Sequence, residues 1–105
     1  MAFTKFKQTV ANYFTSNPKV VHEFKGENIT KGKLFIKSHS SSCGCTSVKY
    51  SREVPPGPFV IEMTIDKGEN FKGFFAIDSR IEFTDGVNSE WITLAITGEV
   101  NDSVS

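Results

Sequence analysis

Four side chains in this sequence could bind a metal ion or carry thiol chemistry: Cys43, Cys45, His22 and His39. The Cys-x-Cys spacing is tighter than the usual Cys-x(2–4)-Cys pair of a zinc site, and the chain has no second pair. A bridge between the two cysteines would close almost no loop, so we do not expect a disulfide framework. Three interpretations remain for the pair: a glycine-requiring bend with a buried thiol, which we favour, a metal site, or a redox site.

Nucleophilic catalysis would need an orienting acid and an oxyanion hole beside a cysteine and a histidine. The sequence has no nucleophile elbow and no motif of paired carboxylates. Its glycines are isolated from one another, which leaves no phosphate-binding loop. We therefore expect no enzyme activity, no bound metal and no cofactor.

The balance of charges limits the possible partners. The 105 residues include 12 Lys+Arg and 12 Asp+Glu, for a formal net charge of zero, which argues against a nucleic-acid partner. No apolar run approaches the roughly 18–20 residues of a membrane span. The first eight residues carry charges every few positions and lack the apolar core of a secretion signal, so we expect a location in the cytoplasm or in a virion.

Alternation of apolar and polar residues predicts β-strands separated by turns. Residues 59–66 and 91–100 are the clearest strands, with an inward stripe formed by Phe59, Ile61, Met63, Ile65, Leu94 and Ile96. Shorter candidates are 20–24, 33–37, 74–77 and 81–83. Turns are expected at 17–18, 25–28, 31–32, 55–58, 67–70 and 85–86. This pattern predicts one all-β domain over residues 1–105, an immunoglobulin-like antiparallel β-sandwich of about seven to eight strands.

The two ends of the chain are less regular. Residues 1–16 place their apolar side chains near helical spacing but are rich in residue types that favour strands, so we expect a strand or an arm there. Residues 101–105 are polar, and we expect a flexible tail.

One segment carries a family resemblance: Ser41-Ser42-Cys43-Gly44-Cys45-Thr46, followed by Pro56-Gly57, the strand 59–65, Gly73 and the segment Leu94-x-Ile96-x-Gly98-Glu99-Val100. It resembles a bacterial family of unknown function, common in Bacteroidetes, whose signature is Ser-Cys-Gly-Cys-Thr. That family is similar to the Hydin-type (ASH) immunoglobulin-like domains and, more distantly, to the major sperm protein fold. The resemblance implies a sandwich of seven or eight strands with a binding or structural role, and it implies no activity.

We therefore expect a non-enzymatic structural or interaction module, an accessory subunit that docks on a protein partner in a larger assembly. One version is a capsid decoration protein or other virion protein of a tailed phage. The alternatives are a cellular ASH-like adaptor domain and a thiol or metal-binding protein that uses Cys43 and Cys45. The oligomeric state stays open.

Aromatic residues are the candidates for the interface with that partner. Trp91 falls on the outward side of its strand by parity, where it could anchor an interface or fold over the end of the sandwich. Phe3, Phe6 and Phe14 could form an apolar arm that adds a strand to a neighbour.

Overall fold

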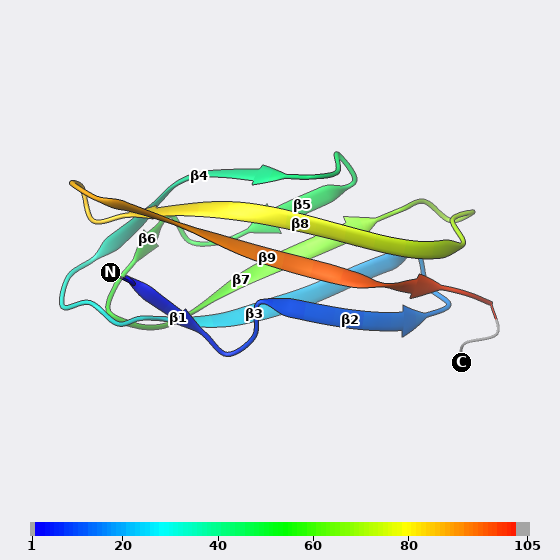
Figure 1. The fold of residues 1–105 in the computed structure, drawn as a ribbon, viewed down its shortest axis with the longest axis horizontal. Coiled ribbons are helices and arrows are strands. Elements are labelled where there is room, and N and C mark those ends of the chain that lie inside the picture. Colours follow the sequence, from blue (N-terminus) through cyan, green and yellow to red (C-terminus); the bar gives the residue numbers. More distant parts are fainter. Residues whose placement is uncertain (1, 103–105) are drawn as a thin grey trace.

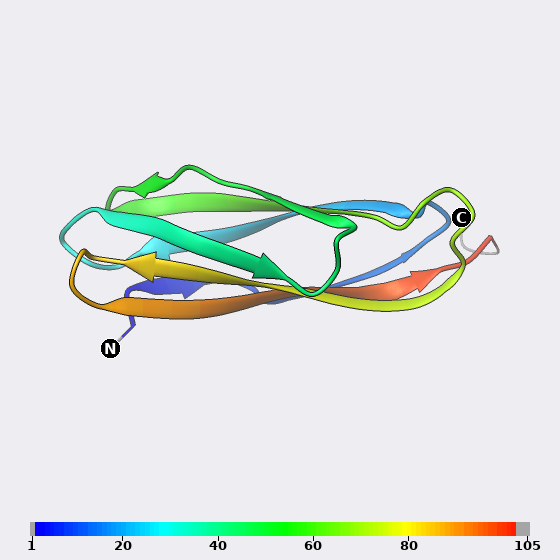
Figure 2. The same cartoon turned by 90° about the horizontal axis from the view of Figure 1, so that it is seen from above.

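Nine β-strands in residues 2–102, the part of the chain that the computed structural model describes, form two sheets packed face to face (Figures 1 and 2). The strands are β1 (Thr4–Phe6), β2 (Val10–Thr15), β3 (Lys19–Asn28), β4 (Leu34–Ser41), β5 (Thr46–Lys49), β6 (Glu53–Val54), β7 (Gly57–Asp66), β8 (Gly73–Thr84) and β9 (Ser89–Val100). The expectation of an all-β, immunoglobulin-like sandwich is confirmed. No helix in the described residues has the length and apolar character needed to cross a bilayer.

The two sheets differ in size and in strand order. The four-stranded sheet has the order β1-β3-β7-β5, and the five-stranded sheet has the order β2-β9-β8-β4-β6. Every pair is antiparallel except β2 with β9, which run parallel from Val10 opposite Ala95 to Thr15 opposite Val100. The structure thus differs from the predicted antiparallel sandwich of seven to eight strands in this one parallel pair and in the number of short strands.

Every second side chain of the long strands points into the core between the two sheets. In β7 the side chains of Ile61, Met63 and Ile65 are fully buried, and in β9 those of Leu94 and Ile96 are as well. The predicted inward stripe is confirmed at these positions, and its remaining member, Phe59, packs against the core. The segments 74–77 and 81–83, which looked like two strands, are parts of the single strand β8.

Two glycines make room for close packing inside the sheets. Gly26 lies between Phe6 and Phe59 in the strand register, and a Cβ atom there would stand 2.7 Å from the Phe59 ring and 2.8 Å from the Phe6 ring. A Cβ atom on Gly98 would stand 1.8 Å from the carbonyl oxygen of Tyr13 on β2. The turn predicted at 25–28 is therefore wrong, because Gly26 is a packing residue within β3.

The N-terminal segment is divided between the two sheets. Its β1 pairs with β3 in the four-stranded sheet and its β2 pairs with β9 in the five-stranded sheet, so the segment expected as a strand or an arm contains two short strands. At the other end, the backbone N–H of Asn101 donates to the carbonyl of Thr15, and Lys72 forms an ion pair with Asp102 at 3.0 Å. Residues 103–105 of the predicted flexible tail lie outside the described residues.

Candidate functional site

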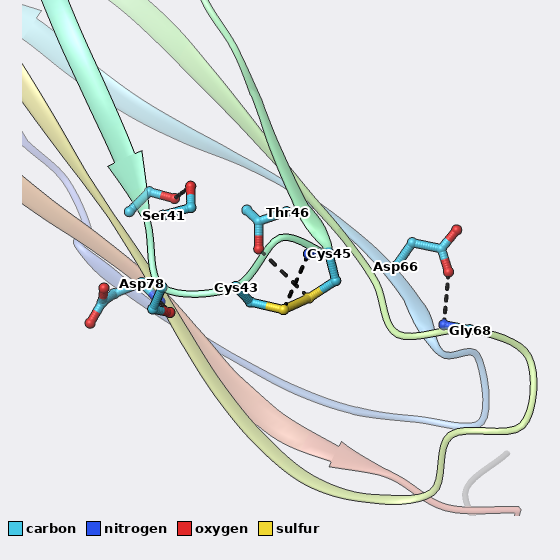
Figure 3. Close-up of a disulfide and its surroundings, with 9 residues drawn as sticks. Ser41, Cys43, Cys45, Thr46, Asp66, Gly68 and Asp78 are labelled. Carbon is cyan, nitrogen blue, oxygen red and sulfur yellow. Dashed lines mark hydrogen bonds between the residues drawn. A yellow bond between two sulfur atoms is a disulfide. The ribbon is translucent and has the colours of Figure 1, made fainter.

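A loop of four residues crosses from β4 in one sheet to β5 in the other, and it contains the Cys-Gly-Cys segment (Figure 3). Cys43 and Cys45 form a disulfide bond, which corrects the expectation that they would not be bridged. The physical reason is the turn at this point: the N–H of Thr46 donates to the carbonyl of Cys43 at 3.2 Å. This turn brings the two Cα atoms to 5.2 Å, within the usual range for a disulfide, whereas an extended chain would separate them by about 7 Å.

Hydrogen bonds hold this crossover loop on both sides. On the side of β8, the N–H of Ser42 donates to the carbonyl of Asp78 at 2.9 Å, and the N–H of Asp78 donates to the Ser42 hydroxyl at 3.1 Å. The hydroxyls of Ser41 and the fully buried Ser79 are 2.7 Å apart. On the side of β7, the N–H of Asp66 donates to the carbonyl of Cys45 at 3.0 Å. The loop is therefore fixed to both sheets independently of its sulfur atoms.

The sulfur atoms themselves have polar neighbours. The N–H of Cys45 donates to the Sγ of Cys43 at 3.2 Å, and the Thr46 hydroxyl lies 3.9 Å from the Sγ of Cys45. Both cysteines are half-buried and pack against the core, while Gly44 between them is exposed with open space around its Cα. The carboxylates of Asp66 and Asp78 point away from the sulfur atoms (Figure 3).

The structure does not bring the two histidines to the cysteines. The Nδ1 atom of His22 on β3 lies 2.6 Å from the Tyr13 hydroxyl on β2, and the Nδ1 atom of His39 on β4 lies 2.8 Å from the Tyr50 hydroxyl that follows β5. Each pair joins one sheet to the other. Burial lowers the pKa of His22 below its ordinary value, partly opposed by the negative charge of Glu23, and burial raises the pKa of Tyr13.

A metal site is not assembled from the four candidate ligands. Both sulfur atoms are in the disulfide, and each histidine has a tyrosine partner. Within residues 2–102, no three side chains of the His, Cys, Asp and Glu types form a group that could hold a metal ion.

The outer face of the five-stranded sheet carries large exposed aromatic side chains. Phe14 on β2 and Phe74 on β8 are 66% and 78% exposed, and both are paired in register with Glu99 on the strand between them. We call these three residues the Phe14–Glu99–Phe74 row. Farther along the same face Trp91 is 51% exposed, with the Arg80 guanidinium 5.7 Å from the centre of its ring.

The interface candidates from the sequence fall into two groups. Trp91 and Phe14 point outward, which confirms the parity argument for Trp91. Phe3 is buried, and Phe6 packs edge-on against Phe59 with ring centres 5.4 Å apart. These two belong to the core, because β1 pairs with β3 of its own chain. The prediction that they contact a partner is therefore wrong.

Phe74 is the candidate that the sequence reasoning missed. A signal was present, because two consecutive phenylalanines in a half-buried strand must place one ring on each side of the sheet. Phe75 takes the inward position and is buried, which leaves Phe74 in solvent.

The outer face of the four-stranded sheet is different in chemistry. It has a hollow of about 410 Å³ that is lined by charged residues (Lys5, Lys7, Lys25 and Glu27) and by apolar ones (Phe6, Pro58, Phe59 and Val60). Charged side chains occupy most of the outward positions of its two long central strands: Lys19, Glu23, Lys25, Glu27, Glu62 and Asp66. Such a mixture of signs is typical of a solvated surface.

Solved structures of several other proteins share this fold. The VesB protease of Vibrio cholerae has a TM-score of 0.75 and 19% identity over 92% of this chain and 32% of its own. A protein of unknown function from Porphyromonas gingivalis W83 has a TM-score of 0.72 and 16% identity over 91% of this chain and 46% of its own. The chain thus spans about a third and less than half of these two proteins.

The third structure is the ASH/PapD-like domain of human CEP192 (PapD-like domain 7), with a TM-score of 0.72 and 10% identity over 94% of this chain and 85% of that one. At these identities the likeness shows the fold alone. No curated protein matches the chain in sequence.

The family resemblance carried by the Ser41–Thr46 segment is confirmed by a match of nearly the whole sequence. The profile of the family described as protein of unknown function (DUF1573) matches residues 1–100. That match covers both sheets, the crossover loop with its disulfide and the aromatic outer face. The chain is therefore a two-sheet β-sandwich that belongs to the DUF1573 family.

Proposed function

We propose that this chain is an interaction module that binds another protein through the outer face of its five-stranded sheet. The observation that carries the proposal is the Phe14–Glu99–Phe74 row, in which two largely exposed aromatic rings flank one carboxylate. Exposed apolar surface of this kind marks protein interfaces, and aromatic residues are enriched in them.

Energetics support a docking role for the two phenylalanines. A ring in water contributes little to the stability of its own fold, whereas full burial of a phenylalanine side chain is worth roughly 1.5–3 kcal/mol. Glu99 forms no ion pair within residues 2–102. We therefore expect the partner to present an apolar surface with a lysine or arginine placed to meet Glu99.

The proposal also concerns the kind of larger assembly to which the chain would belong. We favour a cellular ASH-like adaptor role, because the CEP192 domain resembles the chain over most of the length of both proteins. A virion role, such as a capsid decoration protein, rests only on the recurrence of immunoglobulin-like folds in such proteins. Genomic neighbours that encode capsid and portal proteins would favour the virion role, and their absence would favour the adaptor.

Site-specific photo-crosslinking tests the docking face. Phe74 is replaced by p-benzoylphenylalanine in the source organism, the cells are irradiated, and the products are identified by mass spectrometry. The matched control carries the same group at Val21, which is 48% exposed on the outer face of the four-stranded sheet. We expect a discrete protein adduct at position 74 that is absent at position 21.

Charge reversal makes the test sharper. Glu99→Lys in the crosslinking chain should abolish the adduct if the partner presents a basic group there. Equal adducts from positions 74 and 21, or none from position 74, would overturn the assignment of this face.

A further inference from the structure

The Cys43–Cys45 disulfide contributes little to holding the fold together. A disulfide stabilises a protein mainly by restricting the unfolded chain, and the effect shrinks with the length of the loop that it closes. These cysteines are two positions apart, so the closed loop is close to the shortest possible. The crossover loop is already fixed by hydrogen bonds from Ser42 to Asp78 and from Asp66 to Cys45. Stabilisation therefore does not explain why a disulfide is present at this position.

The surroundings of the bridge suit thiol chemistry. Both cysteines are half-buried and not enclosed, and Gly44 between them is exposed, so the segment lies at the surface where another protein can reach it. The N–H of Cys45, 3.2 Å from the Sγ of Cys43, is placed to stabilise a thiolate on Cys43. Donation to sulfur lowers the pKa of a thiol and improves it as a leaving group.

We propose that the Cys43–Cys45 bridge is a thiol–disulfide exchange site whose substrates are pairs of cysteine thiols in another protein. The substrate thiolate attacks the Sγ of Cys45 and forms a mixed disulfide, while the bond between the two sulfurs breaks and Cys43 leaves as a thiolate. Cys43 is the better leaving group because it receives the hydrogen bond from the Cys45 N–H.

The second step completes the electron balance. The other substrate thiolate attacks the substrate sulfur of the mixed disulfide, and Cys45 leaves as a thiolate. The substrate loses two electrons and two protons and gains a disulfide, while Cys43 and Cys45 take up the two electrons and two protons as thiols. The reverse exchange with a disulfide-bonded protein restores the bridge, so that the site passes electron pairs between two proteins.

The loop should keep its shape when the bridge opens. Its anchors are formed by the backbone of Ser42 and Cys45, by the Ser42 hydroxyl and by the hydrogen bond between Ser41 and Ser79, none of which involves sulfur. Reduction therefore leaves both thiols presented at the same place, as repeated exchange requires.

A redox titration separates this role from a purely structural bridge. The full chain is equilibrated in mixtures of reduced and oxidised glutathione at millimolar concentration, alkylated, and analysed by mass spectrometry. We expect half of the chains to become reduced within the accessible mixtures, with a thermal midpoint only a few degrees lower on reduction. A bridge that stays oxidised in every mixture, or a reduced chain that unfolds, would overturn the proposal.

Single variants test the roles assigned to the two sulfurs. The pH profile of alkylation by iodoacetamide is measured for Cys45→Ser, which keeps the thiol of Cys43, and for Cys43→Ser, which keeps that of Cys45. We expect the Cys43 thiol to titrate at the lower pH, because the N–H at position 45 donates to the side chain at position 43 and so reaches a sulfur atom only in Cys45→Ser. The opposite order would contradict the assigned leaving group.

A protein substrate completes the test. Reduced, unfolded ribonuclease A is mixed with the oxidised chain, and its free thiols are counted with time. We expect the loss of two ribonuclease thiols for each chain that becomes reduced, and no loss with the Cys43→Ser/Cys45→Ser double variant, which is expected to fold. Reaction with glutathione but not with ribonuclease would overturn the assignment of protein thiols as the substrate.

Discussion

The buried side chains of the inward stripe dominate stability at the scale of single residues. Ile61 and Leu94 are completely buried, and truncation of either to alanine leaves a cavity between the sheets. We expect Ile61→Ala and Leu94→Ala each to lower the free energy of unfolding by roughly 2–5 kcal/mol, measured by denaturant titration. The neighbouring Thr93→Ala, on the exposed side of β9, should change it by less than about 0.5 kcal/mol. Equal losses on both sides would contradict the assignment of faces.

A second residue-scale prediction concerns the close approach of β2 to β9. An added Cβ on Gly98 would meet the carbonyl oxygen of Tyr13, a backbone atom that cannot move without moving β2. Gly98→Ala should therefore destabilise the protein by roughly 1–3 kcal/mol or more and loosen β2, which hydrogen exchange of its amides would detect. The control is Gly32→Ala, because nothing lies within 4 Å of the added atom at Gly32.

Single residues predicted one part of the candidate site, the outward position of Trp91, but not the disulfide. Parity along β9 placed Trp91 outside, because a regular half-buried strand reports its faces in its own sequence. The disulfide was missed because its feasibility depends on the turn that brings Cys43 and Cys45 to a Cα separation of 5.2 Å. The spacing of the two cysteines in the sequence is not enough to predict that turn.

At the scale of elements, the long strands could be predicted and the short ones could not. β7 and β9 alternate over at least ten residues, whereas β5 and β6 are four and two residues long and are held by pairing with β7 and β4. The parallel pairing of β2 with β9 joins segments at opposite ends of the chain, and no local pattern encodes it. Gly26 looks like a turn residue because its packing partner, the Phe59 ring, is distant in sequence.

Two tyrosine–histidine pairs join one sheet to the other, and the Tyr13–His22 pair predicts a pH dependence of stability. Burial holds the pKa of His22 below its unfolded value, so the unfolded chain binds a proton more readily than the folded one. His22 therefore favours the folded state above a pH of about 6.5, and this contribution is lost as the pH falls from there toward the folded pKa.

The measurement compares unfolding free energies at pH 7.5 and pH 5. Carboxylates also titrate toward the acid end, so the informative quantity is the difference between the parent chain and His22→Gln. We expect a smaller loss of stability at pH 5 in the variant. An identical loss in both chains would show that the Tyr13–His22 pair does not couple protonation to folding.

At the scale of the whole molecule, the two outer faces of the sandwich differ in chemistry. The four-stranded sheet exposes mixed charges along β3 and β7, and the five-stranded sheet exposes aromatic rings along β2, β8 and β9. The crossover loop joins β4 to β5 between the two layers (Figure 2), and it contains the Cys43–Cys45 disulfide. The proposed docking face and the proposed exchange site therefore lie on different parts of one fold.

This division predicts that docking and stability can be changed independently. Phe14→Ser/Phe74→Ser removes two exposed rings that contribute little to the core, so the thermal midpoint should stay within a few degrees of the parent. Binding to the partner identified by crosslinking should weaken by at least tenfold, because each ring contributes on the order of 1 kcal/mol or more when buried at an interface.

The matched control makes the same change on the other face. Val21 and Val60 are 48% and 43% exposed on the four-stranded sheet, and Val21→Ser/Val60→Ser should leave affinity unchanged in calorimetric titration. Each double variant removes two exposed apolar groups from one face, although the phenylalanines are more exposed than the valines. General surface hydrophobicity therefore predicts weaker binding in both variants, while a docking site on β2 and β8 predicts weaker binding in the phenylalanine variant alone. Equal weakening by both variants would contradict a specific docking face, because only a defined site distinguishes one layer of the sandwich from the other.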